Sequence, residues 1–139
     1  MNLFCLQNFK SEFDKLKSKK PYRTIEKDII DYFFEKEIDQ LFSGTRLNGC
    51  SDSPYIKKRL NGSGGFRIYF LLIVRKENVY LMFVHPKTGP DGSDNITDES
   101  KAFLYKEVYR CIQSNDLYKL TLDDSKEKIV FEKISTGSL

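Results

Sequence analysis

Hydrophobic residues recur at two different spacings along the chain, and these spacings predict both helices and strands. Phe9, Phe13 and Leu16 follow helical spacing, which predicts a first helix at about residues 8–19. The short apolar run before it, residues 1–7, is expected to form a strand.

A second helix is predicted to begin at Ile25, with Thr24 as its N-cap, and to end at Ser43-Gly44. Its apolar side chains form a broad face that we expect to pack in the core: Ile25, Ile29, Tyr32, Phe33, Ile38, Leu41 and Phe42.

Three strands are predicted next, at about residues 55–60, 66–75 and 78–85, after a loop at residues 45–54. The segment Lys76-Glu77-Asn78 between two hydrophobic runs is typical of a tight hairpin turn.

A third helix is predicted after the loop TGPDGSDNI, with Thr97 as its N-cap. Its apolar residues are Ala102, Phe103, Val108, Tyr109 and Ile112. Two further strand-like runs, LYKLTL and KIVFEKI, flank Asp123-Asp124-Ser125 and predict a hairpin within residues 116–134.

Composition limits the class of protein. A chain of 139 residues forms one domain with one modest core, and 40% hydrophobic and 31% charged residues are ordinary globular usage. No apolar run approaches a membrane span, and residues 1–7 lack the basic leader of a signal peptide. The three cysteines have no metal-ligand spacing, which indicates reduced thiols. We therefore expect a cytoplasmic protein without a membrane partner.

Positive charge is concentrated in the predicted strands. Residues 43–87 carry 8 basic and 2 acidic side chains, a net charge of +6, whereas residues 1–42 are neutral and residues 88–139 carry −3. A local excess of this kind suits nucleic-acid binding, although the outer face of an ordinary sheet is also charged.

The strongest candidate site lies on the first two predicted strands. Alternation places Lys57 and Arg59 on one face, and Arg67 and Tyr69 on one face of the next strand. If the strands pair around a turn at residues 61–65, these side chains converge and can bind an anion such as a polyphosphate chain. The alternative is a hairpin with solvated basic side chains.

The same segment carries a family resemblance. A basic strand YIKKRL, the turn and strand GSGGFRIYF, and a hydrophobic strand that ends near a lysine resemble the RelE/ParE superfamily, the toxins of bacterial toxin–antitoxin pairs. The segments NFKSEFDKLKSKKPYRTIEKDIIDYF and FSGTRL resemble the opening helical hairpin of that family and the connection that follows it. The resemblance covers roughly residues 7–113.

The resemblance implies an α+β fold for a single domain, residues 1–139. In that fold an amino-terminal helical hairpin packs on a small twisted antiparallel sheet, followed by a third helix. Residues 114–139, with their predicted hairpin, extend beyond the usual family core. Expected partners are a cognate antitoxin protein, the ribosome and messenger RNA.

The resemblance also implies RNA cleavage near the end of the third predicted strand. His85 and Lys87 share a face there, and His85 is the one side chain whose ordinary pKa lies near neutrality. Cleavage without metal needs a group that removes the 2′-hydroxyl proton, cations that stabilise the transition state, and a group that protonates the leaving oxygen. Lys57 can also carry a proton if neighbouring cations lower its pKa.

The predicted catalytic set is therefore Lys57, Arg59, Arg67, His85 and Lys87. The arginines suit phosphate clamping because the guanidinium fork binds two oxygens and stays charged. Lys58 and Tyr69 are predicted to bind RNA, although Tyr69 is equally suited to the core.

No cofactor or metal is expected, because the chain has no Walker loop, dinucleotide fingerprint or zinc-ligand pair. The prediction is a metal-independent messenger-RNA endoribonuclease that inhibits translation. The alternatives are a ParE-type toxin that binds DNA gyrase and a non-catalytic RNA-binding protein of the same fold.

Overall fold

A mixed sheet of seven strands organises the structure, a computed structural model that describes residues 1–60, 65–86 and 97–134. The strands lie in the order β2-β3-β4-β5-β1-β6-β7. Their bounds are β1 Asn2–Cys5, β2 Thr45–Arg46, β3 Tyr55–Leu60, β4 Phe66–Ile73, β5 Asn78–Pro86, β6 Tyr118–Leu122 and β7 Ile129–Lys133. The α+β class predicted from the sequence is confirmed.

The expectation of a purely antiparallel sheet is wrong at one pair of strands. β1 runs parallel to β5, with Asn2 opposite Asn78 and Cys5 opposite Leu81, whereas every other neighbouring pair is antiparallel. Parallel neighbours require a long connection, and here the first two α-helices and three other strands lie between them in the chain. β1 therefore lies inside the sheet, between β5 and β6.

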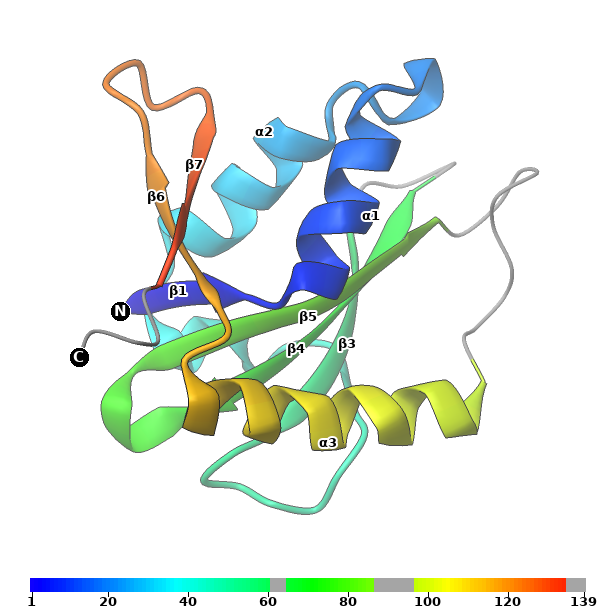
Figure 1. Cartoon of the computed structure of the whole chain (residues 1–139), viewed down its shortest axis with the longest axis vertical. Coiled ribbons are helices and arrows are strands. Elements are labelled where there is room, and N and C mark those ends of the chain that lie inside the picture. Colours follow the sequence, from blue (N-terminus) through cyan, green and yellow to red (C-terminus); the bar gives the residue numbers. More distant parts are fainter. Residues whose placement is uncertain (61–64, 87–96, 135–139) are drawn as a thin grey trace.

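The helices lie on both faces of the sheet (Figure 1). The helices α1 (Gln7–Lys17) and α2 (Ile25–Ile29) cover one face, and α3 (Asp98–Ser114) covers the other. Single turns complete the elements: η1 Lys20–Tyr22, the π-helical η2 Ile30–Phe34, η3 Ile38–Phe42 and η4 Val74–Lys76.

The second predicted helix is not continuous. It widens into the π-helical turn η2, leaves helical geometry at Glu35, and resumes as η3, for which Glu37 and Gln40 form a reciprocal capping box. Thr24 does not cap α2 in the predicted way, because its hydroxyl donates to the Asp28 carboxylate at 3.1 Å.

Two hydrophobic clusters hold the layers together. Under the helix pair, Phe33 packs edge-on against Phe70 of β4 with ring centroids 5.2 Å apart, and both side chains are fully buried. On the opposite face α3 buries Leu104, Val108 and Cys111 against the sheet. The apolar face predicted for α3 is therefore partly wrong: the exposed fraction of Phe103 is 57%, and Ala102 is also exposed.

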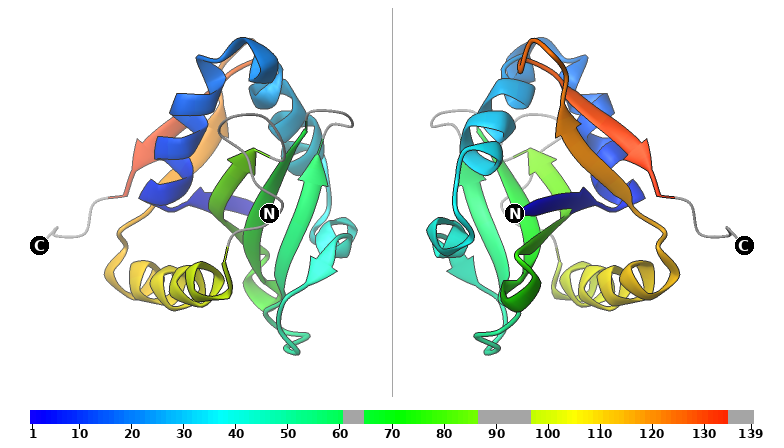
Figure 2. Two further views of the ribbon diagram at one scale, coloured as in Figure 1. Left: turned by 90° about the vertical axis from the view of Figure 1, so that its right-hand side faces the viewer. Right: turned by 90° about the vertical axis from the view of Figure 1, so that its left-hand side faces the viewer.

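The carboxy-terminal hairpin β6–β7 belongs to the same sheet. β6 pairs with β1, Leu120 is buried, and the ring of Phe131 lies 5.5 Å from that of Phe13 on α1. The backbone N–H of Ile129 donates to the Glu26 carboxylate at 2.8 Å. Figure 2 shows the hairpin standing beside α1, so it closes one end of the helical layer.

Within the part of the chain that the structure describes, no helix has the length and apolar character needed to cross a membrane.

Candidate functional site

The predicted cationic residues form a row across three neighbouring strands. Arg59 on β3 lies opposite Arg67 on β4, and Arg67 lies opposite His85 on β5. Directly paired residues share a face of the sheet and have Cβ atoms about 5 Å apart. We call Arg59, Arg67 and His85 the basic row.

A second row lies two residues away on the same face. Lys57 pairs with Tyr69, and Tyr69 pairs with Phe83. The strands that carry Lys57, Arg59, Arg67 and Tyr69 therefore pair as the alternation predicted. Both rows belong to the face that α3 covers, since Tyr69 and Phe83 pack in the cluster that contains Leu104 and Val108.

Solvent reaches the basic row. Arg59 is exposed, and Arg67, His85 and Lys57 are partly exposed. An extended anionic ligand can therefore contact all four side chains from one side of the sheet.

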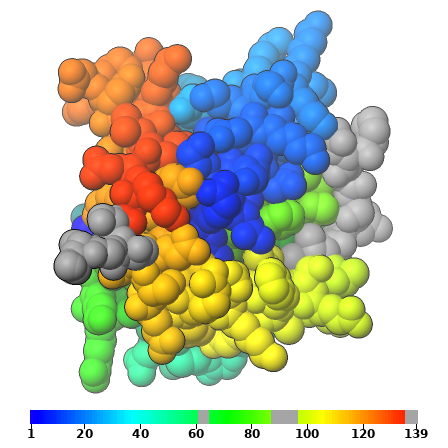
Figure 3. Space-filling view, in the orientation of Figure 1, coloured from blue at the N-terminus to red at the C-terminus, as the bar shows by residue number. Residues whose placement is uncertain are grey.

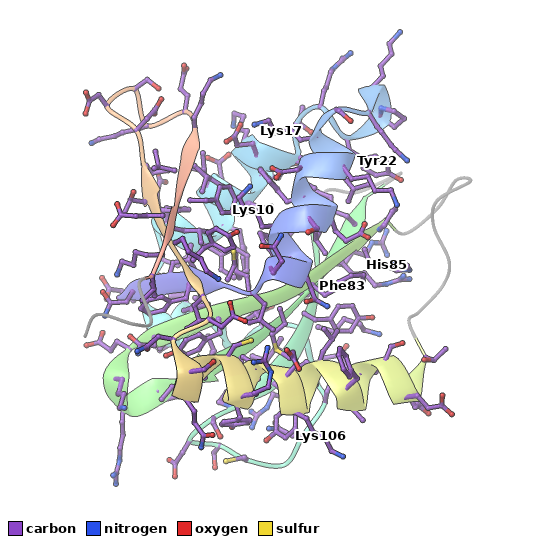
Figure 4. All side chains as sticks on the ribbon, in the orientation of Figure 1. Lys10, Lys17, Tyr22, Phe83, His85 and Lys106 are labelled. Atoms are coloured by element: carbon purple, nitrogen blue, oxygen red, sulfur yellow. The ribbon has the colours of Figure 1, made fainter. Side chains whose placement is uncertain are left out.

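The end of β5 is flanked by two helices. β1 pairs with β5 no further than Leu81, and the N–H of Leu6 donates to the Leu81 carbonyl at 3.0 Å just before α1 begins. α1 then packs beside the second half of β5. In the space-filling view a strip of β5 remains visible between α1 and α3 (Figure 3). Figure 4 places Phe83 and His85 in this region.

Electrostatics favour the neutral form of His85. Partial burial lowers the pKa of the imidazole, and the Arg67 guanidinium lowers it further, whereas Glu12 on α1 acts in the opposite direction. At neutral pH the imidazole is therefore available to accept a proton.

Lys57 is shifted in the same direction. Burial lowers the pKa of its ammonium group, and the nearby charges of Lys101 on α3 and Arg67 add to the effect. The site thus combines two proton carriers whose pKa values are lowered with two permanently charged guanidinium groups. Proton carriers and fixed cations of this kind are groups that can assist phosphodiester transfer without a metal.

Three predicted residues stand apart from this arrangement. Lys58 points to the opposite face, where its ammonium group donates to the Ser43 hydroxyl at 3.0 Å and lies 5.5 Å from the centre of the Tyr32 ring. Tyr69 is fully buried, so its ring cannot stack on a base in this conformation. Lys87 lies outside the described residues. RNA binding by Lys58 stays a prediction that this geometry does not favour.

Some neighbours of the site were not anticipated from the sequence. Glu12 and Lys101 come from different helices, and helical patterns do not indicate which strand end a helix will flank. Phe83 stacks on His85 with ring centroids 6.0 Å apart and an interplanar angle of 25°. Its place on the same face as His85 follows from strand alternation, which is the signal that could have identified it.

Two other features of the described residues concern metal ligands and a cavity. No group of three or more His, Cys, Asp or Glu side chains is placed to hold a metal ion within residues 1–60, 65–86 and 97–134. A cavity of about 560 Å³ lies away from the basic row, between β1, the end of η2 and β6.

Comparison of the chain with models of known protein families gives no match, and comparison with curated proteins gives none.

Proposed function

We propose that the chain is a toxin of the RelE/ParE type that cleaves messenger RNA in the ribosome without a metal ion. The main support for the proposal is the basic row, with Lys57 beside it on the same face of the sheet, where solvent reaches all four side chains. The order of elements after β1 also fits the resemblance: a helical pair, the antiparallel strands β2 to β5, and a third helix.

In the proposed reaction the 2′-oxygen of one nucleotide attacks the adjacent phosphorus. The new O2′–P bond forms as the P–O5′ bond breaks, which leaves a 2′,3′-cyclic phosphate and a free 5′-hydroxyl. His85 takes the 2′-hydroxyl proton, and Lys57 donates a proton to the departing 5′-oxygen. Arg67 and Arg59 bind the non-bridging oxygens and stabilise the added charge. Lys87 remains a predicted second proton carrier.

A cognate antitoxin is proposed as the protein partner. The cavity of about 560 Å³ has Phe33 on its helical side and Leu120 and Leu122 on its hairpin side. An amphipathic antitoxin segment can bury an apolar face there while its acidic residues approach Lys119. In this proposal the carboxy-terminal hairpin extends the sheet and also forms one wall of the antitoxin-binding cavity.

Controlled expression in a bacterium tests the function. We expect growth and translation to stop, and Arg67→Ala to relieve the arrest without unfolding the chain. Lys58→Ala is the matched control, because it removes a cation from the same strand pair but from the opposite face, and it should remain toxic.

Two outcomes would contradict the proposal. Unimpaired growth with abundant folded protein would exclude a toxin. Stalled DNA replication with intact messages would favour the ParE-type alternative, in which DNA gyrase is the partner.

A further inference from the structure

A small pocket lies next to the basic row. Asn8 at the start of α1, Phe83 on β5, and Ser100, Phe103 and Leu104 on α3 enclose about 160 Å³. The pocket therefore joins three elements that are distant in sequence.

The lining of the pocket suits a flat, partly polar ring. Phe83, Phe103 and Leu104 provide apolar surface, whereas Asn8 and Ser100 are the polar residues of the lining. The Ser100 hydroxyl accepts from the Thr97 hydroxyl at 3.0 Å and can still donate. A closed cavity of about 150 Å³ accommodates a benzene molecule, so an open pocket of about 160 Å³ has room for one ring system.

Phe103 is unusual in its exposure. Its exposed fraction is 57%, the largest among the exposed hydrophobic side chains Met1, Phe42, Phe103 and Val130 of the described residues. The helix does not use this ring for core packing, since α3 buries Leu104, Val108 and Cys111 instead. A ring held at the mouth of a pocket is a ready platform for stacking.

Phe83 connects the pocket to the basic row, where the phosphate is proposed to bind. Phe83 lines the pocket and also stacks on His85, with ring centroids 6.0 Å apart. An RNA chain with one phosphate bound to Arg67 and His85 would therefore bring a neighbouring base within reach of Phe103. The positive charge of the basic row attracts a phosphate backbone, and an exposed aromatic ring beside it suits the unpaired bases of a single strand.

We propose that this pocket binds one unpaired nucleobase of the RNA, stacked on Phe103, beside the nucleotide whose phosphate lies on the basic row. The inference rests on the proposed function and adds a subsite that selects single-stranded RNA. Asn8 and Ser100 contact the edge of the base and influence which base is preferred.

Binding of short 2′-O-methyl oligonucleotides, which lack the attacking hydroxyl, tests the pocket without cleavage. We expect Phe103→Ala to weaken binding by about 5- to 150-fold, which corresponds to the ~1–3 kcal/mol typical of one stacked base. A series of oligonucleotides, each abasic at a different position, identifies the stacked base. At one position, loss of the base should weaken binding to the wild type by a similar factor and should not change binding to the Phe103→Ala protein. Val130→Ala, an exposed apolar control on β7, should change nothing.

Tryptophan fluorescence gives a second test, because the chain contains no tryptophan. Emission from the Phe103→Trp protein should be quenched when the oligonucleotide binds, whereas emission from the Phe42→Trp protein should not change. Equal changes in emission from both tryptophan variants, or unaltered binding by Phe103→Ala, would overturn the base pocket. If binding still depended on Arg67, the proposed function would stand. Failure of the wild-type chain to bind any oligonucleotide would overturn the base pocket, whereas cleavage of a ribosome-bound message would still support the proposed function.

Discussion

The salt dependence of RNA binding tests the charge arrangement quantitatively. The perturbation is Arg67→Ala, which removes the central charge of the basic row. Because Arg67 is partly exposed, we expect the fold to remain intact. The assay is fluorescence anisotropy with a non-cleavable single-stranded oligonucleotide at pH 7.5, where the lowered pKa of His85 keeps that side chain neutral.

The expected magnitude follows from three charged side chains on one face, Lys57, Arg59 and Arg67. Each phosphate neutralised on a single strand contributes about −0.7 to the slope of log K against log salt, so the wild-type slope should be about −2.1 and the variant slope about −1.4. Between 50 and 200 mM salt, affinity should then fall about 18-fold for the wild type and about 7-fold for Arg67→Ala.

Lys58→Ala is again the control, since Lys58 lies on the opposite face, beside Ser43 and Tyr32, and should leave the slope unchanged. Equal slopes for the wild type and Arg67→Ala would show that Arg67 does not contact a phosphate. A reduced slope for Lys58→Ala would place RNA on the opposite face and refute the assignment of the binding surface.

Three further predictions concern the fold and its titrating groups. Gly44 has a φ of +116°, and an added Cβ would lie 2.6 Å from a backbone oxygen of β3, so Gly44→Ala should lower the free energy of unfolding in urea by more than about 1 kcal/mol. Gly49→Ala, where a Cβ meets nothing within 4 Å, is the control and should be near neutral. Cys50 should be the first cysteine alkylated by iodoacetamide, because it is exposed and hydrogen bonds within its loop lower its pKa. The other two thiols are buried, so mass spectrometry that finds either of them modified first would contradict this. The pKa of His85 is lowered in the folded chain, so below about pH 6.5 the unfolded chain binds more protons than the folded chain. The free energy of unfolding of the wild type should therefore fall from pH 7.5 to 5.5, and that of His85→Asn should fall less. Identical pH profiles of the two proteins would refute this.

Local patterns were sufficient to predict much of the fold around the site. β3 has the predicted bounds, and α3 follows Thr97, whose hydroxyl accepts the Ser100 N–H at 3.0 Å. The convergence of Lys57, Arg59 and Arg67 follows from alternation along two strands joined by a short connection, which requires no knowledge of distant contacts.

Features that depend on distant contacts could not be predicted. The position of β1 beside β5 requires pairing between Asn2 and Asn78, which no local pattern specifies. The exposure of Phe103 was missed because the apolar residues of α3 occupy adjoining stripes, and packing against the sheet selects the stripe that contains Leu104. The approach of Glu12 to His85 likewise depends on how α1 packs beside β5.

Cleavage of a ribosome-bound message by the purified chain is the direct test of the proposed nuclease activity. Primer extension should reveal a cut within the message, and analysis of the new ends should find a 2′,3′-cyclic phosphate and a 5′-hydroxyl. The cut should disappear when the nucleotide before it carries a 2′-hydrogen, and Arg67→Ala should slow it by about a hundredfold or more. An intact message after prolonged incubation with folded wild-type chain, or an equal cut in the 2′-deoxy message, would contradict the account.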